Sequence, residues 1–597
     1  MPFTTQRRPA KNPARTAALF WLWTAPVLAC LAVEVLNGGL PRTILTPLQI
    51  VLNLVWYYIL EYLFYLCSNR WWTSARFILI FGWALGVVNH YLFRFRGRAL
   101  FPGDFLTLDT AANVAGNYSY LPDLPQLLVT AAVALLVWRV GKAPREKRPR
   151  SLRRALTGCS LSAAFVLLFF GTDFTQWVGI TPALWNTSDN GLALNFTVSL
   201  DCYQVSPPDF YSANVSVEDP EPPEEGVVPA NIIVIMNESL ADLSVLGDVP
   251  MTADPLAGWR ARTENTIKGY AYSSVFGGTT ANSEYEFLTG NSMAFLPAGS
   301  VPYEMYVEEG DPSLVGQMKA LGYTTAAVHP YEADGWNRPE VYADFGFDET
   351  HFQEDFDDPE TFRGFVSDRA DYRWIMDRYR YKDAGEKLFL FNVTMQNHGG
   401  YDRDWAGLTP SVALSGDLAG QYPNVDQYLS CVHESDKALT LLLDYFERQE
   451  EPTLILLFGE HQPQTYSTFH DDVLGTDAEL DVAGREKKQM VPFLLWANYD
   501  IPEEEDAELS LNYLSTLLME TAHLPLTSYQ ALLSQLRLAV PVLNLEGCRS
   551  FDGEWHESPE DLTGAARVLA RRYEALEYNS VFDREGRQDE LFVVGTG

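Results

Sequence analysis

Close-spaced cysteine pairs are missing from this 597-residue chain. Its six cysteines stand far apart, at positions 30, 67, 159, 202, 431 and 548, and three of them fall in apolar segments. A disulfide framework or a cysteine-based metal site is recognised by paired spacings such as Cys-x-x-Cys. The cysteine pattern therefore indicates neither kind of site.

Basic residues are scarce after position 174. Residues 175–597 hold 25 of the 43 lysines and arginines but 71 of the 78 aspartates and glutamates, a net charge of −46. Nucleic-acid binding needs a basic surface, so this imbalance argues against it. An acidic excess of this kind is typical of a soluble domain. Residues 1–174, by contrast, are apolar and carry a net charge of +11.

Five apolar runs in the first 174 residues approach the length that crosses a bilayer. They cover residues 17–37, 46–67, 75–93, 124–141 and 155–172. The first run lacks a convincing cleavage site and is followed by four more, so it does not resemble a cleavable signal peptide. Residues 1–174 are therefore predicted to form a five-span transmembrane domain.

Loop charges predict the orientation of these spans. One basic cluster comprises Arg7, Arg8, Lys11 and Arg15, and a second lies between residues 142 and 154. The positive-inside rule places both clusters in the cytoplasm. Five spans then put the C-terminal region outside the cell, although the basic residues at 94, 96 and 98 fall on the predicted outer side. Residues 175–228, which end in a stretch rich in proline and acid, are predicted to be a linker.

The region 229–597 alternates apolar runs with helical stretches. The runs begin with "NIIVIMNESL" at 231–240 and continue at 323–330, 388–398, 453–463 and 490–498. Fully apolar strands between helices indicate a sheet that is covered on both faces. This region is therefore predicted to be one α/β domain.

Four of these runs end in side chains that suit metal binding or acid–base chemistry, and ligands of open α/β sheets bind beyond the carboxyl ends of the strands. Taken singly, a glutamate there could complement a helix dipole, and a histidine could be a satisfied core residue. Together they indicate a site, because carboxylate with imidazole suits Mn²⁺, Zn²⁺ or Mg²⁺, and a threonine oxygen could complete the shell. The four endings are Glu238, His329, Asn397-His398 and Glu460-His461.

Two further stretches carry candidate chemistry. In "FGGTTANSEYEFLTG" (276–290), two glycines precede Thr279 and Thr280 at a predicted helix start. The stretch is either a turn with a threonine N-cap or a hydroxyl nucleophile placed where helix N–H groups favour an anion. In "WNR" (336–338), the arginine suits phosphate through its bidentate geometry, and a loop salt bridge is the alternative.

The order of these motifs after five spans resembles the lipoteichoic acid synthase family, also called phosphoglycerol transferases. Members have five spans and an outer sulfatase-like domain of the alkaline phosphatase superfamily. The matching stretches are "NIIVIMNESLADL", "GGTTANSEYEFLTG", "HPYEADGWNR", "MQNHGGY" and "FGEHQP". The last departs from the family's common Gly-Asp-His, because Glu460 stands in the aspartate position, and this leaves the metal preference open.

The resemblance implies a role for each candidate residue. Thr280 would be the nucleophile, with Thr279 as a cap or supporting donor, and one divalent ion would be bound, with Mn²⁺ favoured and Mg²⁺ as the alternative. The implied metal ligands are Glu238, Thr280, Glu460 and His461; the implied catalytic residues are Thr280, His398 and His329; the implied substrate-binding residues are Trp336, Arg338, His398 and His329.

The resemblance also implies the reaction. The protein would be a multi-pass enzyme of the cell membrane that moves glycerol phosphate from phosphatidylglycerol to an acceptor hydroxyl through a covalent threonine intermediate. The acceptor would be an anionic polymer, a glycolipid or a glycan. A phosphoethanolamine transferase, a phosphodiesterase and a non-catalytic membrane-anchored polymer-binding or sensor protein are the alternatives. A sulfatase would need cysteine or serine at position 280, and a phosphoethanolamine transferase usually shows disulfides and a more histidine-rich metal cluster.

Overall fold

The structure is a computed structural model. It describes residues 13–37, 45–96, 99–105, 120–145, 151–172, 174–180, 190–200, 205–297, 299–333, 335–403, 405, 408–465, 468–477 and 479–594. By its contacts the chain divides into two compact units that meet in the sequence at Gln204 and Val205.

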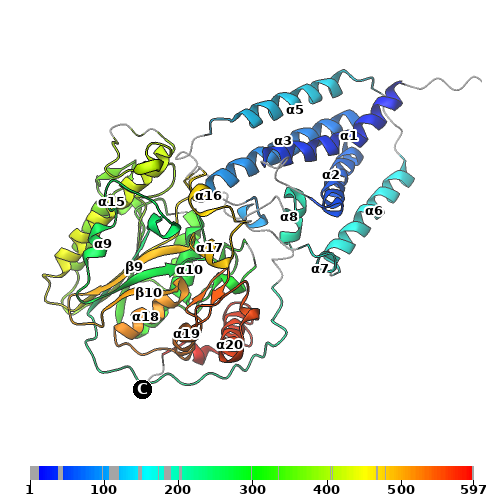
Figure 1. Cartoon of the computed structure of the whole chain (residues 1–597). Helices are drawn as coiled ribbons and strands as arrows, with labels where there is room; N and C mark the ends of the chain where they lie inside the picture. Colours follow the sequence, from blue (N-terminus) through cyan, green and yellow to red (C-terminus); the bar gives the residue numbers. More distant parts are fainter. Residues whose placement is uncertain are drawn as a thin grey trace, which may run out of the picture. The chain divides into compact units, whose positions relative to one another are not determined.

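The first unit contains five long apolar helices, coloured blue to cyan in Figure 1. They are α1 (Pro13–Leu36), α2 (Pro47–Ser68), α3 (Trp71–Arg96), α5 (Leu124–Lys142) and α6 (Leu152–Phe170). Each is long and apolar enough to cross a membrane, so the five predicted spans are confirmed as helices. Several basic residues on which the predicted orientation depends lie outside the described residues: Arg7, Arg8, Lys11, Lys147, Arg148 and Arg150.

Small residues let α1 and α3 approach closely. A Cβ atom on Gly82 of α3 would lie 2.8 Å from the Cβ of Ala29, and one on Gly86 would lie 2.8 Å from Leu36. Two glycines four residues apart are a common way to bring membrane helices together, because backbones can then touch.

The predicted linker 175–228 contains a helix, α8 (Leu192–Ser199), that belongs to the first unit and packs on α2. Asn53 of α2 donates a hydrogen bond to the carbonyl of Asn190 at 2.6 Å and accepts one from the backbone of Leu194 at 2.9 Å. This part of the linker therefore has tertiary contacts of its own, and the domain boundaries remain predictions.

The second unit is built on an eight-stranded sheet with the order β10-β2-β9-β8-β1-β7-β3-β4. The strands β8, β1, β7, β3 and β4 run parallel, β9 is antiparallel to both of its neighbours, and β10 is parallel to β2. In sequence order their bounds are β1 Asn231–Asn237, β2 Thr266–Tyr272, β3 Tyr323–Val328, β4 Glu349–His351, β7 Lys387–Val393, β8 Thr453–Gly459, β9 Met490–Ala497 and β10 Glu504–Ser510.

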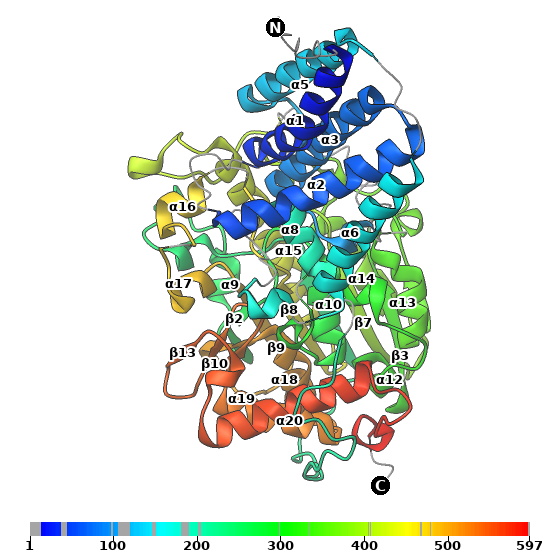
Figure 2. The same ribbon diagram turned by 90° about the vertical axis from the view of Figure 1, so that its right-hand side faces the viewer.

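Helices cover both faces of this sheet, as fully apolar strands require. Along β1, Ile232, Val234 and Met236 pack on one face, and Ile233 and Ile235 pack on the other. The first face carries α10 (Thr280–Thr289), α12 (Leu314–Ala320), α13 (Arg338–Phe345), α18 (Leu514–Thr521), α19 (Ser528–Ala539) and α20 (Gly564–Val581), and the second carries α9 (Ala257–Ala261), α14 (Asp368–Arg380) and α15 (Pro423–Phe446). Figures 1 and 2 show α9 beside α15 and α19 beside α20.

The predicted α/β class is therefore confirmed, but three strands were missed. The sequence of β2, "TIKGYAY", lacks a continuous apolar run, and β10, "EEDAELS", is mostly acidic. The short strand β4 ("ETH") is polar as well. Both β10 and β4 stand at edges of the sheet, where exposed backbone permits polar residues that the central strands exclude.

Candidate active site

The site lies at the carboxyl ends of four neighbouring strands, β8, β1, β7 and β3. These strands end at nearly the same level, since Asn237 pairs with Gly459, Met236 with Val393 and Val328 with Asn392. The residues that follow directly are Glu460, Glu238, Thr394 and His329. Three of the four predicted endings, Glu238, His329 and Glu460, therefore lie along one edge of the sheet, whereas Asn397 and His398 come four and five residues after the end of β7.

Glu238, Glu460 and His461 converge at this edge. All three are buried, and one potential ligand atom from each lies within 4.8 Å of those from the other two. The Nε2 atom of His461 is 3.1 Å from Oε1 of Glu460, and its Nδ1 atom is 2.8 Å from the carbonyl of Gln462. A carbonyl that holds Nδ1 leaves Nε2 as the nitrogen available to the cluster.

Electrostatics make this cluster attractive to a cation. Burial, and then the nearby carboxylate of Glu460, raise the pKa of Glu238 well above its usual range. Burial also opposes the charge on Glu460, but His461 and hydrogen bonds from Thr280 and Glu238 outweigh it and lower its pKa to about 2. Two carboxylates, an imidazole and a hydroxyl form a donor set that fits a divalent ion, which would balance the charge of both carboxylates.

Thr280 is the first residue of α10, it is buried, and its side chain helps to lower the pKa of Glu460. The chain reaches it through a tight turn in which Gly277 has φ 68° and Gly278 has φ 154°. A side chain at Gly277 would also clash, because its Cβ would lie 2.7 Å from the Cβ of Gln464. Glycine is therefore required here by both the backbone conformation and the lack of space.

Thr279 occupies the N-cap position, but its side chain makes no capping hydrogen bond. Its backbone is left-handed, with φ 71°, which is rare for a β-branched residue. The interpretation of this threonine as a side-chain cap is therefore wrong. The conformation costs on the order of 1–3 kcal/mol, and such strain is concentrated at functional sites.

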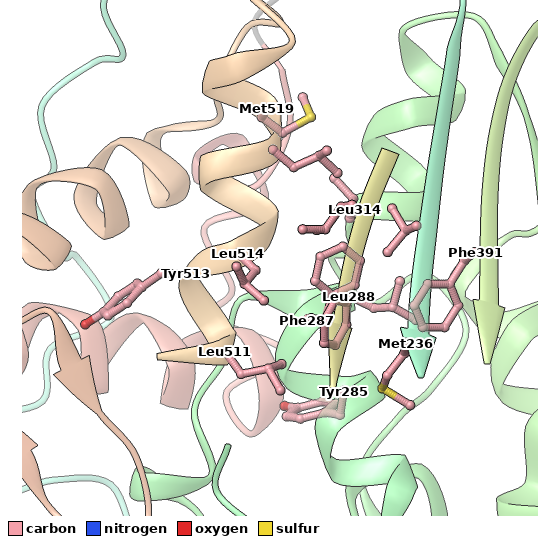
Figure 3. Packing of buried hydrophobic residues seen from close by; sticks show 14 of the residues in the cluster. Met236, Tyr285, Phe287, Leu288, Leu314, Phe391, Leu511, Tyr513, Leu514 and Met519 are labelled. Carbon is pink, nitrogen blue, oxygen red and sulfur yellow. The ribbon is translucent and has the colours of Figure 1, made fainter. Parts of the chain in front are cut away.

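Packing holds the start of α10 against the sheet. Phe287 stacks on Phe391 of β7 with ring centroids 5.8 Å apart, and it contacts Phe458 of β8 at 5.0 Å. In Figure 3, Phe287 and Leu288 lie in the same apolar cluster as Met236 and Phe391. Full burial of one such side chain stabilises the fold by roughly 2–3 kcal/mol, so the position of Thr280 depends on the core.

One turn after Thr280, Glu284 forms a buried ion pair with Arg338. The guanidinium donates to Oε1 through Nη2 at 2.6 Å and through Nε at 3.0 Å. The hydroxyl of Tyr342 donates to Oε2 at 2.7 Å, and that of Tyr303 at 3.3 Å. The structure therefore contains the salt bridge that the sequence offered as the alternative for Arg338, and a direct phosphate contact remains a prediction.

The segment that leads to Arg338 has an uncommon backbone. Trp336 and Asn337 both have left-handed conformations, with φ of 61° and 55°. The carbonyl of Gly335 accepts a hydrogen bond from Nη1 of Arg338 at 3.3 Å, and Trp336 is buried. The Glu284–Arg338 pair thus anchors this loop one helical turn from Thr280.

The two histidines of the predicted site differ in their surroundings. His329 is buried, its Nδ1 lies 2.8 Å from the carbonyl of Val393, and its pKa is lowered well below the usual range by burial and then by Arg338. His398 is half-buried, and its ring lies 5.6 Å from that of Phe365. The charges of Glu460 and His398 also affect His329, so these groups are within electrostatic reach of one another.

Sequence reasoning missed several residues that support the site. Ser239 donates to Oε1 of Glu238 at 2.7 Å, and Thr394 accepts from the Glu238 backbone at 3.0 Å. Arg363 donates to the carbonyl of His398 at 3.0 Å. Ser239 and Thr394 directly follow candidate strand residues and could have been found from position, but no local signal connects Arg363 to His398.

Comparison with known proteins agrees with this geometry. The sulfatase family model matches residues 230–524. A Rhizobium meliloti protein named for cyclic beta-1,2-glucan modification is 30% identical over 421 residues, which cover 66% of this chain and 63% of that protein. The lipoteichoic acid synthase of Staphylococcus saprophyticus is 25% identical over 235 residues, which cover 35% of this chain and 33% of that protein.

A solved structure shares the fold. The phosphoglycerol transferase GacH of Streptococcus pyogenes, in complex with sn-glycerol-1-phosphate, has a TM-score of 0.52 and 19% identity, and the match covers 62% of this chain and 92% of that one. The chain spans less than two thirds of the length of the two curated relatives named above. Residues 230–524 therefore match the sulfatase family, the resemblance of this chain to the lipoteichoic acid synthases is confirmed, and the likeness to the phosphoglycerol transferase GacH is one of fold.

Proposed function

We propose that this protein is a membrane-anchored phosphoglycerol transferase that acts through a covalent intermediate on Thr280. It would take glycerol phosphate from phosphatidylglycerol and pass it to an acceptor hydroxyl on the outer side of the cell membrane. The observation that carries the proposal is the buried position of Thr280, at the start of α10 and within electrostatic reach of Glu460 in a cluster of two carboxylates and an imidazole.

The same cluster would hold one divalent ion through Glu238, Glu460, His461 and the hydroxyl of Thr280. Mn²⁺ is favoured by the resemblance, and Mg²⁺ is the alternative. When bound, such an ion would lower the pKa of the threonine hydroxyl and balance the charge of the phosphate.

In the first step, the Oγ1 atom of Thr280 forms a bond to phosphorus and loses its proton. The bond between phosphorus and the diacylglycerol oxygen breaks, and diacylglycerol leaves after taking up a proton. Helix N–H groups at the start of α10 would stabilise the phosphate oxygens. The left-handed turn at Thr279 presents Thr280 to the cluster, so positioning and charge supply most of the catalysis.

The surroundings of the two histidines favour different roles. The Nδ1 atom of His329 is held by the carbonyl of Val393, so Nε2 of the neutral ring is an acceptor that can position a hydroxyl or water. The half-buried His398 is the better candidate to protonate the departing oxygen.

In the second step, an acceptor hydroxyl attacks the glycerophospho-threonine and restores the hydroxyl of Thr280. The Rhizobium meliloti relatives are named for cyclic beta-1,2-glucan modification and for capsular polysaccharide biosynthesis. These names favour a glycan hydroxyl as the acceptor, with an anionic polymer or a glycolipid as alternatives.

The full-length protein in phosphatidylglycerol vesicles tests the proposal. Thr280→Ala should abolish diacylglycerol release, a loss of about 10³-fold or more, because no other group stands at the start of α10 in its place. Thr279→Ala is the matched control and should retain most of the activity. Mass spectrometry of the wild-type protein, quenched during turnover, should find glycerol phosphate on the peptide that contains Thr280.

Three results would overturn this function. Release of diacylglycerol by Thr280→Ala at the wild-type rate would exclude the covalent step. Loss in Thr279→Ala alone would place the nucleophile one residue earlier. Turnover of phosphatidylethanolamine, with phosphatidylglycerol left intact, would make the protein a phosphoethanolamine transferase.

The predicted orientation needs its own test. A reporter that is active only outside the cytoplasm, fused after Gly597, should be active, and a reporter that is active only inside should be silent. The opposite pattern would contradict the positive-inside assignment.

A further inference from the structure

A cavity of about 530 Å³ lies among three helices of the membrane unit. Its size is in the range of sites that bind small molecules and cofactors. Its wall combines aromatic, acidic and basic groups, which is unusual inside a membrane bundle. The residues that matter here are Trp23 of α1, Tyr58, Glu61 and Tyr62 of α2, and Ser151 and Arg154 at the beginning of α6.

Glu61 gives this cavity a polar group that lacks a partner. The residue is 3% exposed, and among the described residues its Oε1 atom has no hydrogen-bond partner. A carboxyl group inside a membrane helix is costly and normally faces a polar partner or marks a binding site. Glu61 lines the cavity, so a rotation of its side chain would bring this oxygen to a ligand there.

Arg154 lies towards the end of the same cavity. The hydroxyl of Tyr62 donates to the backbone carbonyl of Arg154 at 2.6 Å, and this bond ties α2 to the first turn of α6. Ser151 caps that helix by accepting a hydrogen bond from the backbone of Arg154. A guanidinium in the first turn of a helix is a favourable place for a phosphate group.

The length of the cavity matches one leaflet. Along α2 its lining runs from Tyr58 to Asn69, which is about 16 Å at the helical rise per residue. Half of the hydrocarbon core of a bilayer is about 15 Å thick. Arg154 lies near the beginning of α6, and Glu61 lies about two turns before the end of α2. Tyr58 and Trp23 lie about three turns from the end of α2 and from the beginning of α1.

We propose that this cavity is a binding site for one glycerophospholipid molecule. Its phosphate lies at Arg154, its ester-linked glycerol lies at Glu61, and an acyl chain lies against Trp23 and Tyr58. A phospholipid in a bilayer has its phosphate, glycerol and acyl chains in this same order from the membrane surface inward. A carboxyl group can accept a hydrogen bond from a glycerol hydroxyl and, when it carries a proton, can donate one to an ester carbonyl. The site is separate from Thr280, and the inference does not depend on the proposed reaction.

Photolabelling of the full-length protein in nanodiscs tests this inference. The probes are phosphatidic acid and diacylglycerol that carry the same photoreactive acyl chain, since the two differ only in the phosphate. Phosphatidic acid should label peptides of α1, α2 and α6 around the cavity about tenfold more than diacylglycerol does. Arg154→Gln should remove this preference, whereas Arg153→Gln, its exposed neighbour outside the cavity, should keep it.

Variants of Glu61 test the inner end of the site. Glu61→Leu should reduce labelling by both lipids, and Glu61→Gln, which retains hydrogen-bonding groups, should preserve most of it. Equal labelling by the two lipids, or labelling spread over all lipid-facing helices according to exposure, would mean annular lipid only and would overturn the inference. An unchanged preference in Arg154→Gln would do the same. Only variants whose melting temperature matches that of the wild-type protein are compared, so that misfolding cannot explain a loss of labelling.

Discussion

Successive turns of helix α10 contact buried charges of opposite kinds. At the first turn, Thr280 contacts a cluster that contains two carboxylates and one imidazole. One turn later, Glu284 meets a guanidinium and two tyrosine hydroxyls that satisfy it completely. Both regions are buried and hold glutamate, but the first gathers two carboxylates around one imidazole, whereas the second pairs one carboxylate with a guanidinium and two hydroxyls.

The two regions therefore suit different roles: the first is the proposed reaction site, and the second supports the structure around it. A balanced pair such as Glu284–Arg338 has no need of a ligand, and it holds the Trp336 loop against the helix. The cluster of Glu238, Glu460 and His461 brings two carboxylates and an imidazole together, a donor set that suits a divalent ion. Residues four apart share one helix face, so the supporting pair lies one turn from Thr280, the proposed nucleophile.

The test with the largest expected effect removes the proposed metal ligands one at a time. Glu460→Ala or His461→Ala should lower the bound divalent ion from about one per protein to an undetectable level. The full-length variants should keep the wild-type fold, because the cluster is not needed to hold the sheet together. Elemental analysis measures the ion, and circular dichroism checks the fold.

Glu460→Asp is the control for this experiment and should keep the ion, because aspartate retains the carboxylate at this position. Full metal occupancy in Glu460→Ala and His461→Ala would show that the ligands are elsewhere.

The second test breaks the balanced pair. Arg338→Met leaves the Glu284 carboxylate buried and unpaired, and this should cost about 3–5 kcal/mol of unfolding free energy. Adding Glu284→Gln removes the stranded charge and should recover part of the loss. Thermal and denaturant unfolding measure both changes.

A more exposed pair provides the reference. Lys319 and Asp348 lie 2.6 Å apart with half-exposed side chains, so Lys319→Met should cost less than about 1 kcal/mol. If Arg338→Met costs no more than Lys319→Met, the buried pair does not support the loop as described.

The third test concerns Asp368, a buried carboxylate with hydrogen bonds but no cation in the described part of the chain. Burial raises its pKa to about 6, although Ser435, Asn237 and Thr394 lower it through hydrogen bonds. The folded value exceeds the unfolded value of about 4, so the folded protein binds the proton more tightly. Unfolding free energy is therefore lost as the pH rises from about 4 to about 6.

Asp368→Asn should remove that loss. Relative to wild type, the variant should be equally stable near pH 4 and more stable at pH 7, by on the order of 2 kcal/mol. Melting temperatures at both pH values measure the difference. A difference that is the same at pH 4 and pH 7 would contradict the assignment of the titration to Asp368.

The smallest expected effect is at Thr279. Thr279→Gly should raise the unfolding free energy by about 1 kcal/mol, because glycine adopts the left-handed turn without strain. Thr279→Ala should change stability little, since the threonine side chain makes no cap. A loss of about 1 kcal/mol in Thr279→Ala would restore the capping role that the structure does not show.

Local sequence predicted much of this protein. The five apolar helices and the α/β class were correct, because long apolar runs and fully apolar strands are each stable in few environments. The strands that end just before Glu238, His329 and Glu460 were also correct, whereas the strand predicted to end at His398 ends at Val393, five residues earlier. The strands β2, β4 and β10 were missed because their polar residues depend on neighbours that the local pattern does not contain.

The sequence by itself determined which residue types stand at the strand ends and which stretch follows the two glycines. Only the tertiary structure decided that Glu238 and Glu460, 222 positions apart, share one cluster, because that follows from the adjacency of β1 and β8. It also decided that Arg338 pairs with Glu284, 54 positions away, and that Thr279 is strained and does not cap. The local pattern of apolar and polar residues indicates which parts of a segment are buried. Contacts between distant segments depend on strand order and on the packing of the whole core.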